Sequence, residues 1–152
     1  MGRCVATGAA IAEVSSAENQ ILQALNDLDY GEWQWKTHDE VKLKSAALYQ
    51  TWHTMPHLVR FPGGESLQEL VARAGDVIRY VLEVNPHETV SLVGHESVNR
   101  ALLLQLLEQP LSAYWRLSFD PCGITEIDFV GAIPQVLRVN ETLHLARLLF
   151  ED

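Results

Sequence analysis

Apolar residues recur at helical spacing most clearly over residues 67–82. The positions that share this spacing are Leu67, Leu70, Val71, Ala74, Val77, Ile78, Val81 and Leu82. Intervals of three and four residues place such positions on one face of a helix. Ser66 and Glu69 form a capping-box sequence ahead of them, and Pro86 follows. The pattern therefore predicts an amphipathic helix that begins near Leu67 and ends before Pro86.

Three weaker patterns predict further helices. The Ala-rich segment Arg3–Val14 favours a helix, although no capping residue precedes it. Thr37 and Glu40 form a second capping box, so we expect a helix from there to about residue 52. Another helix is predicted over Ser97–Leu107, with the Ser97 hydroxyl as its N-terminal cap.

Short apolar runs and alternating residues predict the strands. Gln20–Leu25 is compatible with a strand, and Thr89–Val93 is expected to be a short buried strand. Apolar residues alternate over 125–129 and again over 133–139, which predicts a closing hairpin. Helices that alternate with strands in this way predict an α/β fold, a three-layer α/β/α domain with a mixed, mostly parallel central sheet.

The composition fits one folded domain over residues 1–152, since 47% of the residues are hydrophobic and 20% are charged. The formal net charge of −9, with no cluster of Lys or Arg, excludes a nucleic acid as partner. No apolar run is long enough to cross a bilayer, so we expect no membrane partner. Cys4 and Cys122 have no paired spacing, which favours a reducing, cytoplasmic location.

The segment from Val90 to Arg100 places His95 between a predicted strand and the start of a predicted helix. Ligands of open α/β sheets bind at the carboxyl ends of strands, and a helix N-terminus suits an anion such as phosphate. His95 could therefore act as an acid, a base or a phosphate donor, or it could be structural. A nucleophilic role for Ser97 is excluded because the spacing Gly-x-Ser-x-Gly is missing.

Two other groups of residues carry less chemistry. His53 and His57 have the spacing of a zinc pair on a helix, but Pro56 breaks that helix, so we expect no metal site. The four tryptophans are typical of core or loop packing, and Trp33 and Trp35 remain candidates for shaping a pocket.

Five segments match, in the same order, the motifs of one family. They are Arg3-Cys-Val-Ala-Thr7-Gly-Ala, Leu25-Asn-Asp27-Leu-Asp-Tyr-Gly31-Glu-Trp33, Phe61-Pro-Gly-Gly-Glu65-Ser66-Leu67, Val93-Gly94-His95-Glu96 and Asn140-Glu-Thr-Leu-His144-Leu. Together they resemble the histidine phosphatase (phosphoglycerate mutase-like) superfamily. The resemblance implies a phosphoglycerate mutase-like fold and a phosphohistidine mechanism on small phosphorylated substrates, with no cofactor and no metal.

The resemblance also implies roles for single residues. Arg3 matches the Arg that contacts the transferred phosphoryl group, and His95 matches the family's second histidine. Asp27 stands where most members have Glu as the general acid. The backbone N–H of Glu96 would bind phosphate, but Gly is common at that position, and the Glu96 carboxylate would disfavour an anion unless it points away.

One departure from the family concerns the nucleophile. The family opens with a strand that ends in Arg-His-Gly, whose His accepts the phosphoryl group, and no Arg-His-Gly occurs here. We therefore expect an N-terminally truncated member whose first strand is missing and which is inactive as this chain. A homo-oligomer is one way in which such a chain could cover the gap left by the strand. The alternatives are a non-catalytic relative that binds a phosphorylated ligand or a protein, and an incomplete version of a longer enzyme.

Overall fold

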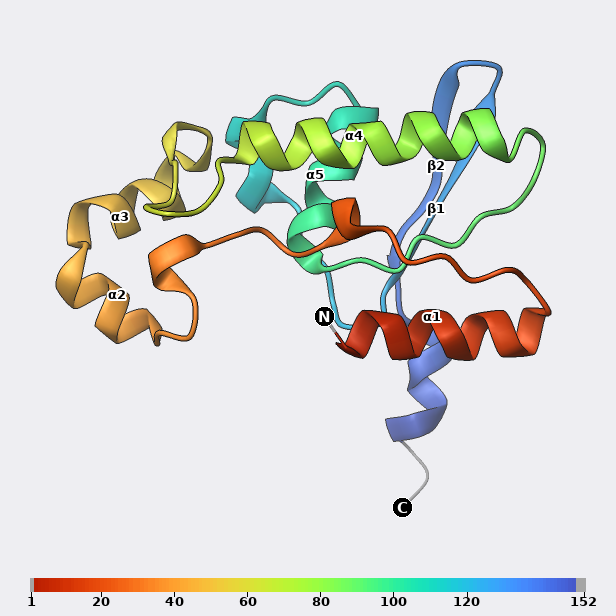
Figure 1. Cartoon of the computed structure of the whole chain (residues 1–152), viewed down its shortest axis with the longest axis horizontal. Coiled ribbons are helices and arrows are strands. Elements are labelled where there is room, and N and C mark those ends of the chain that lie inside the picture. The colour runs from red at the N-terminus through yellow and green to blue at the C-terminus, as the bar shows by residue number, and fades with distance from the viewer. Residues whose placement is uncertain (1, 150–152) are drawn as a thin grey trace.

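The structure is a computed structural model and describes residues 2–149 (Figure 1). Its α-helices are α1 (Gly2–Ser15), α2 (His38–Lys44), α3 (Ala46–Thr54), α4 (Leu67–Val84) and α5 (Glu96–Leu106), and its strands are β1 (Ile124–Val130) and β2 (Ile133–Glu141). Its 3-10 segments are η1 (Gln23–Leu25), η2 (Gly31–Trp33), η3 (Pro56–Leu58), η4 (Leu111–Arg116) and η5 (Leu143–Leu149).

Both predicted capping boxes are confirmed. The Thr37 side chain accepts from the Glu40 N–H at the start of α2, and the Ser66 side chain does the same for Glu69 at the start of α4. The predicted helix after Thr37 is wrong in one respect, because Ser45 separates α2 from α3 with a non-helical backbone, φ −140° and ψ 44°.

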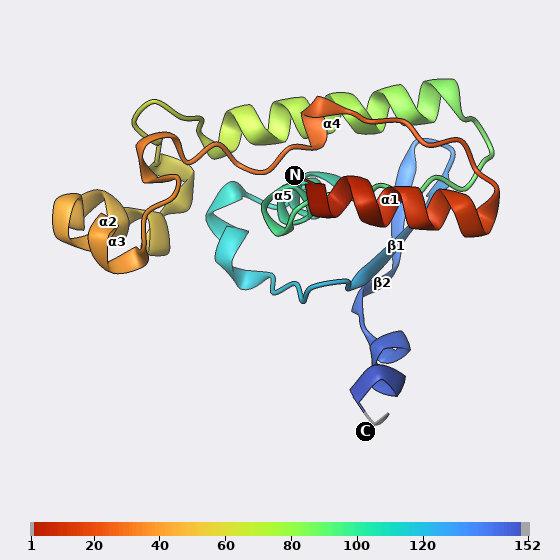
Figure 2. The same cartoon turned by 60° about the horizontal axis from the view of Figure 1, so that its bottom comes forward.

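The core lies between α4 and α5, which pack against each other. It extends to the loops that carry η3 and η4. Its buried members are Leu28, Trp52, Val59, Phe61, Leu67, Leu70, Ala74, Val98, Ala101, Leu102, Leu104 and Tyr114. The α4 members, Leu67, Leu70 and Ala74, lie on the apolar face that the spacing predicts. Helices α2 and α3 project from one end of this core (Figures 1 and 2).

The sheet differs from the prediction. The residues from 2 to 149 form a single two-stranded antiparallel sheet, β1–β2, so the hairpin is confirmed but the mostly parallel central sheet is not formed. Gln20–Leu25 is coil and 3-10 turn, and Thr89–Val93 is coil that is largely exposed. A parallel strand exists only through hydrogen bonds to a neighbouring strand, and the described part of the chain offers Thr89–Val93 no such neighbour.

Helix α1 lies beside the coil that joins α4 to α5 in both views (Figures 1 and 2). The prediction of a helix over Arg3–Val14 is confirmed, but α1 has no buried residue. Its first turn nevertheless approaches the start of α5, and this approach forms the site described next.

Candidate active site at the start of helix α5

Three residues far apart in the sequence meet ahead of α5. The Nη2 atom of Arg3 lies 2.8 Å from Nδ1 of His95 and 3.8 Å from Oδ2 of Asp27. His95 Nδ1 and Asp27 Oδ2 are 3.5 Å apart. Arg3 comes from the first turn of α1, Asp27 from the loop after η1, and His95 from the residue that precedes α5. All three were expected to share one site, and the structure brings them together.

His95 occupies the N-cap position of α5, with an extended backbone and no capping hydrogen bond from its side chain. The first N–H groups of a helix have no partners within it and carry a partial positive charge. The His95 ring is only 5% exposed, so it lies in a dry position beside these donors. The arrangement suits an anion bound at the helix start.

The hydrogen bonds around His95 define its tautomer. Arg3 can only donate, so His95 Nδ1 accepts and the ring proton sits on Nε2. That Nε2 lies 3.4 Å from Cys4 Sγ, and the Cys4 thiol donates to the Gly94 carbonyl at 3.3 Å. Burial lowers the pKa of His95, the nearby Arg3 lowers it further, and Asp27 raises it. The imidazole is therefore neutral at neutral pH.

Cys4 was not predicted as a site residue. Its only signal in the sequence is its position next to Arg3, because the contact with His95 joins residues 91 positions apart.

Ser97 holds the Asp27 carboxylate in place. The Ser97 hydroxyl donates to Asp27 Oδ1, and the Leu28 N–H lies 2.9 Å from Asp27 Oδ1 and 3.1 Å from Ser97 Oγ. The prediction that Ser97 caps α5 is therefore wrong. Ser97 lies inside the first turn of α5, where its hydroxyl orients the carboxylate and leaves Oδ2 facing Arg3 and His95.

Arg73 of α4 fixes the loop that carries Asp27. Its guanidinium donates to the carbonyls of Ala24, Asn26 and Asp27 at 2.6, 2.8 and 3.0 Å. It also forms two bonds to the Glu65 carboxylate, at 3.0 and 2.6 Å. Bidentate Arg–carboxylate pairs of this kind define both position and orientation.

The Pro-Gly-Gly-Glu segment touches the same loop through glycine. Gly31 has a φ of +51°, and a Cβ there would lie 2.2 Å from the Pro62 carbonyl oxygen. This close backbone contact leaves no room for a side chain at residue 31.

The Glu96 carboxylate is paired within its own helix. It accepts from Nη2 of Arg100, one turn further along α5. Arg100 is 4% exposed, and its guanidinium stacks over Tyr114 and Trp115 with centroid distances of 4.6 and 4.8 Å. The carboxylate that the sequence placed near a phosphate therefore points along α5, away from its first N–H groups.

The Asp27 loop lines an open surface hollow of about 490 Å³. Gln34, Arg60 and Arg73 are among the residues that line it, together with Asp29 and Glu65. The two tryptophans considered for a pocket lie elsewhere. Trp33 packs on Phe61, with ring centroids 5.0 Å apart, and Trp35 is fully exposed.

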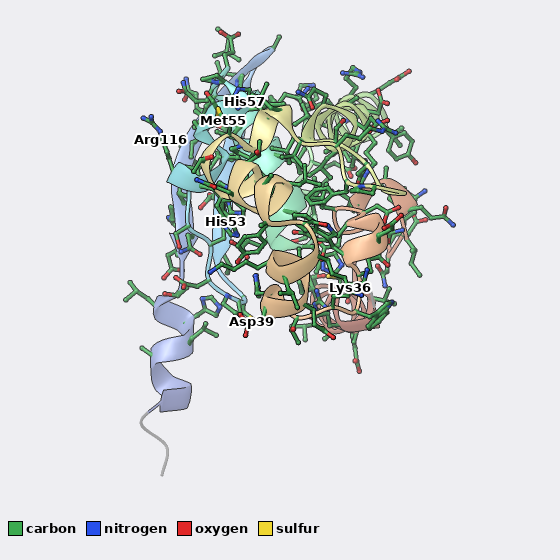
Figure 3. The ribbon with its side chains drawn as sticks, turned by 90° about the vertical axis from the view of Figure 1, so that its left-hand side faces the viewer. Lys36, Asp39, His53, Met55, His57 and Arg116 are labelled. Atoms are coloured by element: carbon green, nitrogen blue, oxygen red, sulfur yellow. The ribbon has the colours of Figure 1, made fainter. Side chains whose placement is uncertain are left out.

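The histidine pair considered for zinc belongs to two elements. Figure 3 shows His53 on α3 and His57 beyond its end, in η3. Across residues 2–149, no group of three or more His, Cys, Asp or Glu side chains could hold a metal ion. None of the helices in this range is long and apolar enough to cross a membrane.

The sequence matches the histidine phosphatase superfamily (branch 1) over residues 1–142. The chain belongs to this superfamily. The resemblance inferred from the five motifs is thus confirmed. Phosphoserine phosphatase 1 of Hydrogenobacter thermophilus is 29% identical over 149 residues, which cover 98% of this chain and 71% of that protein. An adenosylcobalamin/alpha-ribazole phosphatase of Escherichia coli is 26% identical over 72% of this chain and 54% of its own length.

A solved structure shares the fold. Bacillus stearothermophilus YhfR superposes with a TM-score of 0.81 and 23% identity, over 91% of this chain and 71% of that one. The α/β fold of histidine phosphatases is therefore confirmed for the part of the fold that this chain contains.

Proposed function

We propose that this chain forms the phosphoryl-binding half of a histidine phosphatase site for small phosphate esters. The observation that carries the proposal is the meeting of Arg3, Asp27 and His95 at the N-terminus of α5. These residues come from three separate family motifs. The named relatives are phosphatases, which supports a phosphate ester as ligand.

Each residue has a role that its chemistry allows. A transferring phosphoryl group carries charge on its equatorial oxygens, which the Arg3 guanidinium and the backbone N–H of Glu96 would stabilise. His95 donates through Nε2 once an oxygen of the ligand replaces Cys4. Asp27, when it carries a proton on Oδ2, would donate that proton to the leaving oxygen, with Ser97 holding Oδ1.

We further propose that residues 1–152, assayed alone, bind an oxyanion but hydrolyse phosphate esters negligibly. A phosphohistidine mechanism needs a nucleophilic histidine beside the phosphoryl group. Within residues 2–149 no second histidine forms a hydrogen bond or ion pair with Arg3 or Asp27. Loss of a nucleophile that acts with its partners as a unit lowers turnover by several powers of ten. The same observation supports the second candidate, a non-catalytic member that binds a phosphorylated ligand.

An NMR titration with orthovanadate and with inorganic phosphate tests the site. We expect amide shifts at residues 95–97, weakened in Arg3→Met and His95→Gln, with Arg79→Met as a control on exposed charge. Binding confined to a remote surface, or none at millimolar anion, would contradict a retained site. Hydrolysis of p-nitrophenyl phosphate at a rate ordinary for phosphatases, abolished by His95→Ala, would contradict the missing nucleophile.

A further inference from the structure

Glu96 poses an electrostatic problem for any anion site at the start of α5. It is the first residue of the helix, and its backbone N–H is one of the donors that we assign to phosphate. Its side chain is 55% exposed, so the carboxylate has room to move. A free carboxylate beside these N–H groups would compete with the ligand and repel it.

Arg100 removes this competition because its own position is fixed. The guanidinium is buried, lies over two aromatic rings and donates through Nε to the Leu117 carbonyl at 3.0 Å. Burial raises the pKa of Tyr114 to about 12, so that ring stays neutral and offers its face to the cation. The segment η4 thus holds Arg100, and Arg100 offers the Glu96 carboxylate a partner one turn away from the helix start.

We propose that Arg100 is a positioning residue of the anion site, which draws the Glu96 carboxylate along α5 and so leaves the first N–H groups of the helix open to a phosphoryl group. This inference rests on the proposed function of the site. Segment η4 thereby takes part in ligand affinity, although its described residues form no hydrogen bond or ion pair with Asp27 or Arg3.

Arg100 could alternatively be a core residue with no effect on the site beyond packing. The two cases differ in what Glu96 contributes once Arg100 is lost. If Arg100 only packs, its removal weakens anion binding through the fold, and a neutral residue at position 96 restores nothing. If Arg100 restrains Glu96, the same neutral residue restores most of the affinity.

The experiment is a titration of the full chain with inorganic phosphate, followed by NMR at low salt. The variants are Arg100→Met, Glu96→Gln, the two combined, and Glu96→Asp, which keeps the charge but shortens the side chain. We expect Arg100→Met to bind phosphate about fivefold more weakly, because one unpaired charge near a partly solvated site has an effect of this size. The double variant should recover an affinity for phosphate within about twofold of that of the unsubstituted chain. Glu96→Asp, which cannot reach Arg100 as well, should also bind more weakly.

The controls separate charge from position. Glu83→Gln changes the net charge as Glu96→Gln does, but on the exposed side of α4, and should leave affinity unchanged. The weakening in Arg100→Met should shrink at high salt, because exposed charges are screened.

Equal weakening in Arg100→Met and in the double variant would overturn the inference and leave the proposed function in place. Absence of phosphate binding by the unsubstituted chain would overturn both. If Arg100→Met does not fold, Glu96→Asp decides, since it changes only a side chain that is itself 55% exposed and leaves the buried Arg100 in place. Affinity equal to that of the unsubstituted chain would then refute the restraint, and weaker binding would support it.

Discussion

Replacement of Arg73 by methionine should destabilise the protein strongly, because Arg73 ties α4 to the loop that carries Asp27. The variant keeps most of the side chain's apolar length but loses bonds to three carbonyls and to Glu65. The Arg73 and Glu65 side chains are 24% and 16% exposed, so water reaches the Glu65 carboxylate only in part.

The size of the effect follows from these contacts. Removal of one partner of a buried ion pair costs about 3–5 kcal/mol, and partial access to water places this pair at the lower end, at about 3 kcal/mol. In a domain of this size such a loss lowers the melting temperature by roughly 6–12 °C. Arg79→Met is the matched control on the same helix. Arg79 pairs with Asp76 at 68% exposure on each side, so its loss should cost less than about 0.5 kcal/mol.

Urea denaturation and a thermal melt, followed by circular dichroism, measure both variants against the unsubstituted chain. Amide shifts of the Asp27 loop should change in Arg73→Met and stay constant in Arg79→Met. Equal stability of the two variants would refute the reasoning, since it would mean that the five bonds of Arg73 add nothing beyond those of a surface arginine.

Three further predictions concern titration, reactivity and capping. Burial lowers the pKa of His95 below 6.5, so the unfolded chain binds a proton at this residue more readily than the folded chain does. The free energy of unfolding should therefore fall as the pH drops through about 6.5. Urea denaturation between about pH 5 and 8 should show this fall, and His95→Gln should flatten the dependence of stability on pH. Iodoacetamide should label the exposed Cys122 faster than Cys4. In the variant Cys122→Ser, labelling of Cys4 should abolish the binding of phosphate, as followed by NMR, because Cys4 lies beside His95. An unchanged affinity for phosphate would contradict this position of Cys4. Ser66→Ala should lower the free energy of unfolding by about 1 kcal/mol, because it removes the capping box of α4. A thermal melt measures this loss. An unchanged melting temperature would mean that water replaces the cap.

The local elements could be predicted from the sequence because their signals are local. The spacing of apolar residues and the capping box of α4 act within one or two turns, so both appear in the sequence and in the structure. The hairpin is similar in its position, because two adjacent runs of alternating residues flank a short turn. Its register could not be predicted, since Ile127 pairs with Val136 and Phe129 with Pro134. The alternating apolar residues of the second run are exposed instead: Ile133, Leu137 and Val139. His95 could be placed at a helix start for the same reason.

The features that could not be predicted depend on partners far along the chain. Thr89–Val93 has the composition of a buried strand, but a strand requires a neighbour that its own residues do not encode. The sequence around Ser97 is typical of a helix cap, but in the structure its hydroxyl donates to Asp27, which lies 70 positions away in the sequence. The meeting of Arg3 with Asp27 and His95 followed only from the ordered motifs, because no periodicity connects residues this far apart.

The shallow seating of α1 has a consequence for how a ligand would be held. The helix has no buried residue, and among residues 2–149 the hydrogen bonds that tie it to the start of α5 come from Arg3 and Cys4. Such an element can detach and return without unfolding of the α4–α5 core. Because Arg3 is part of α1, a ligand whose binding requires Arg3 binds with the affinity of the docked form multiplied by the fraction of molecules in which α1 is docked. A substitution that only strengthened the seating of α1, without touching the ligand, would then tighten binding.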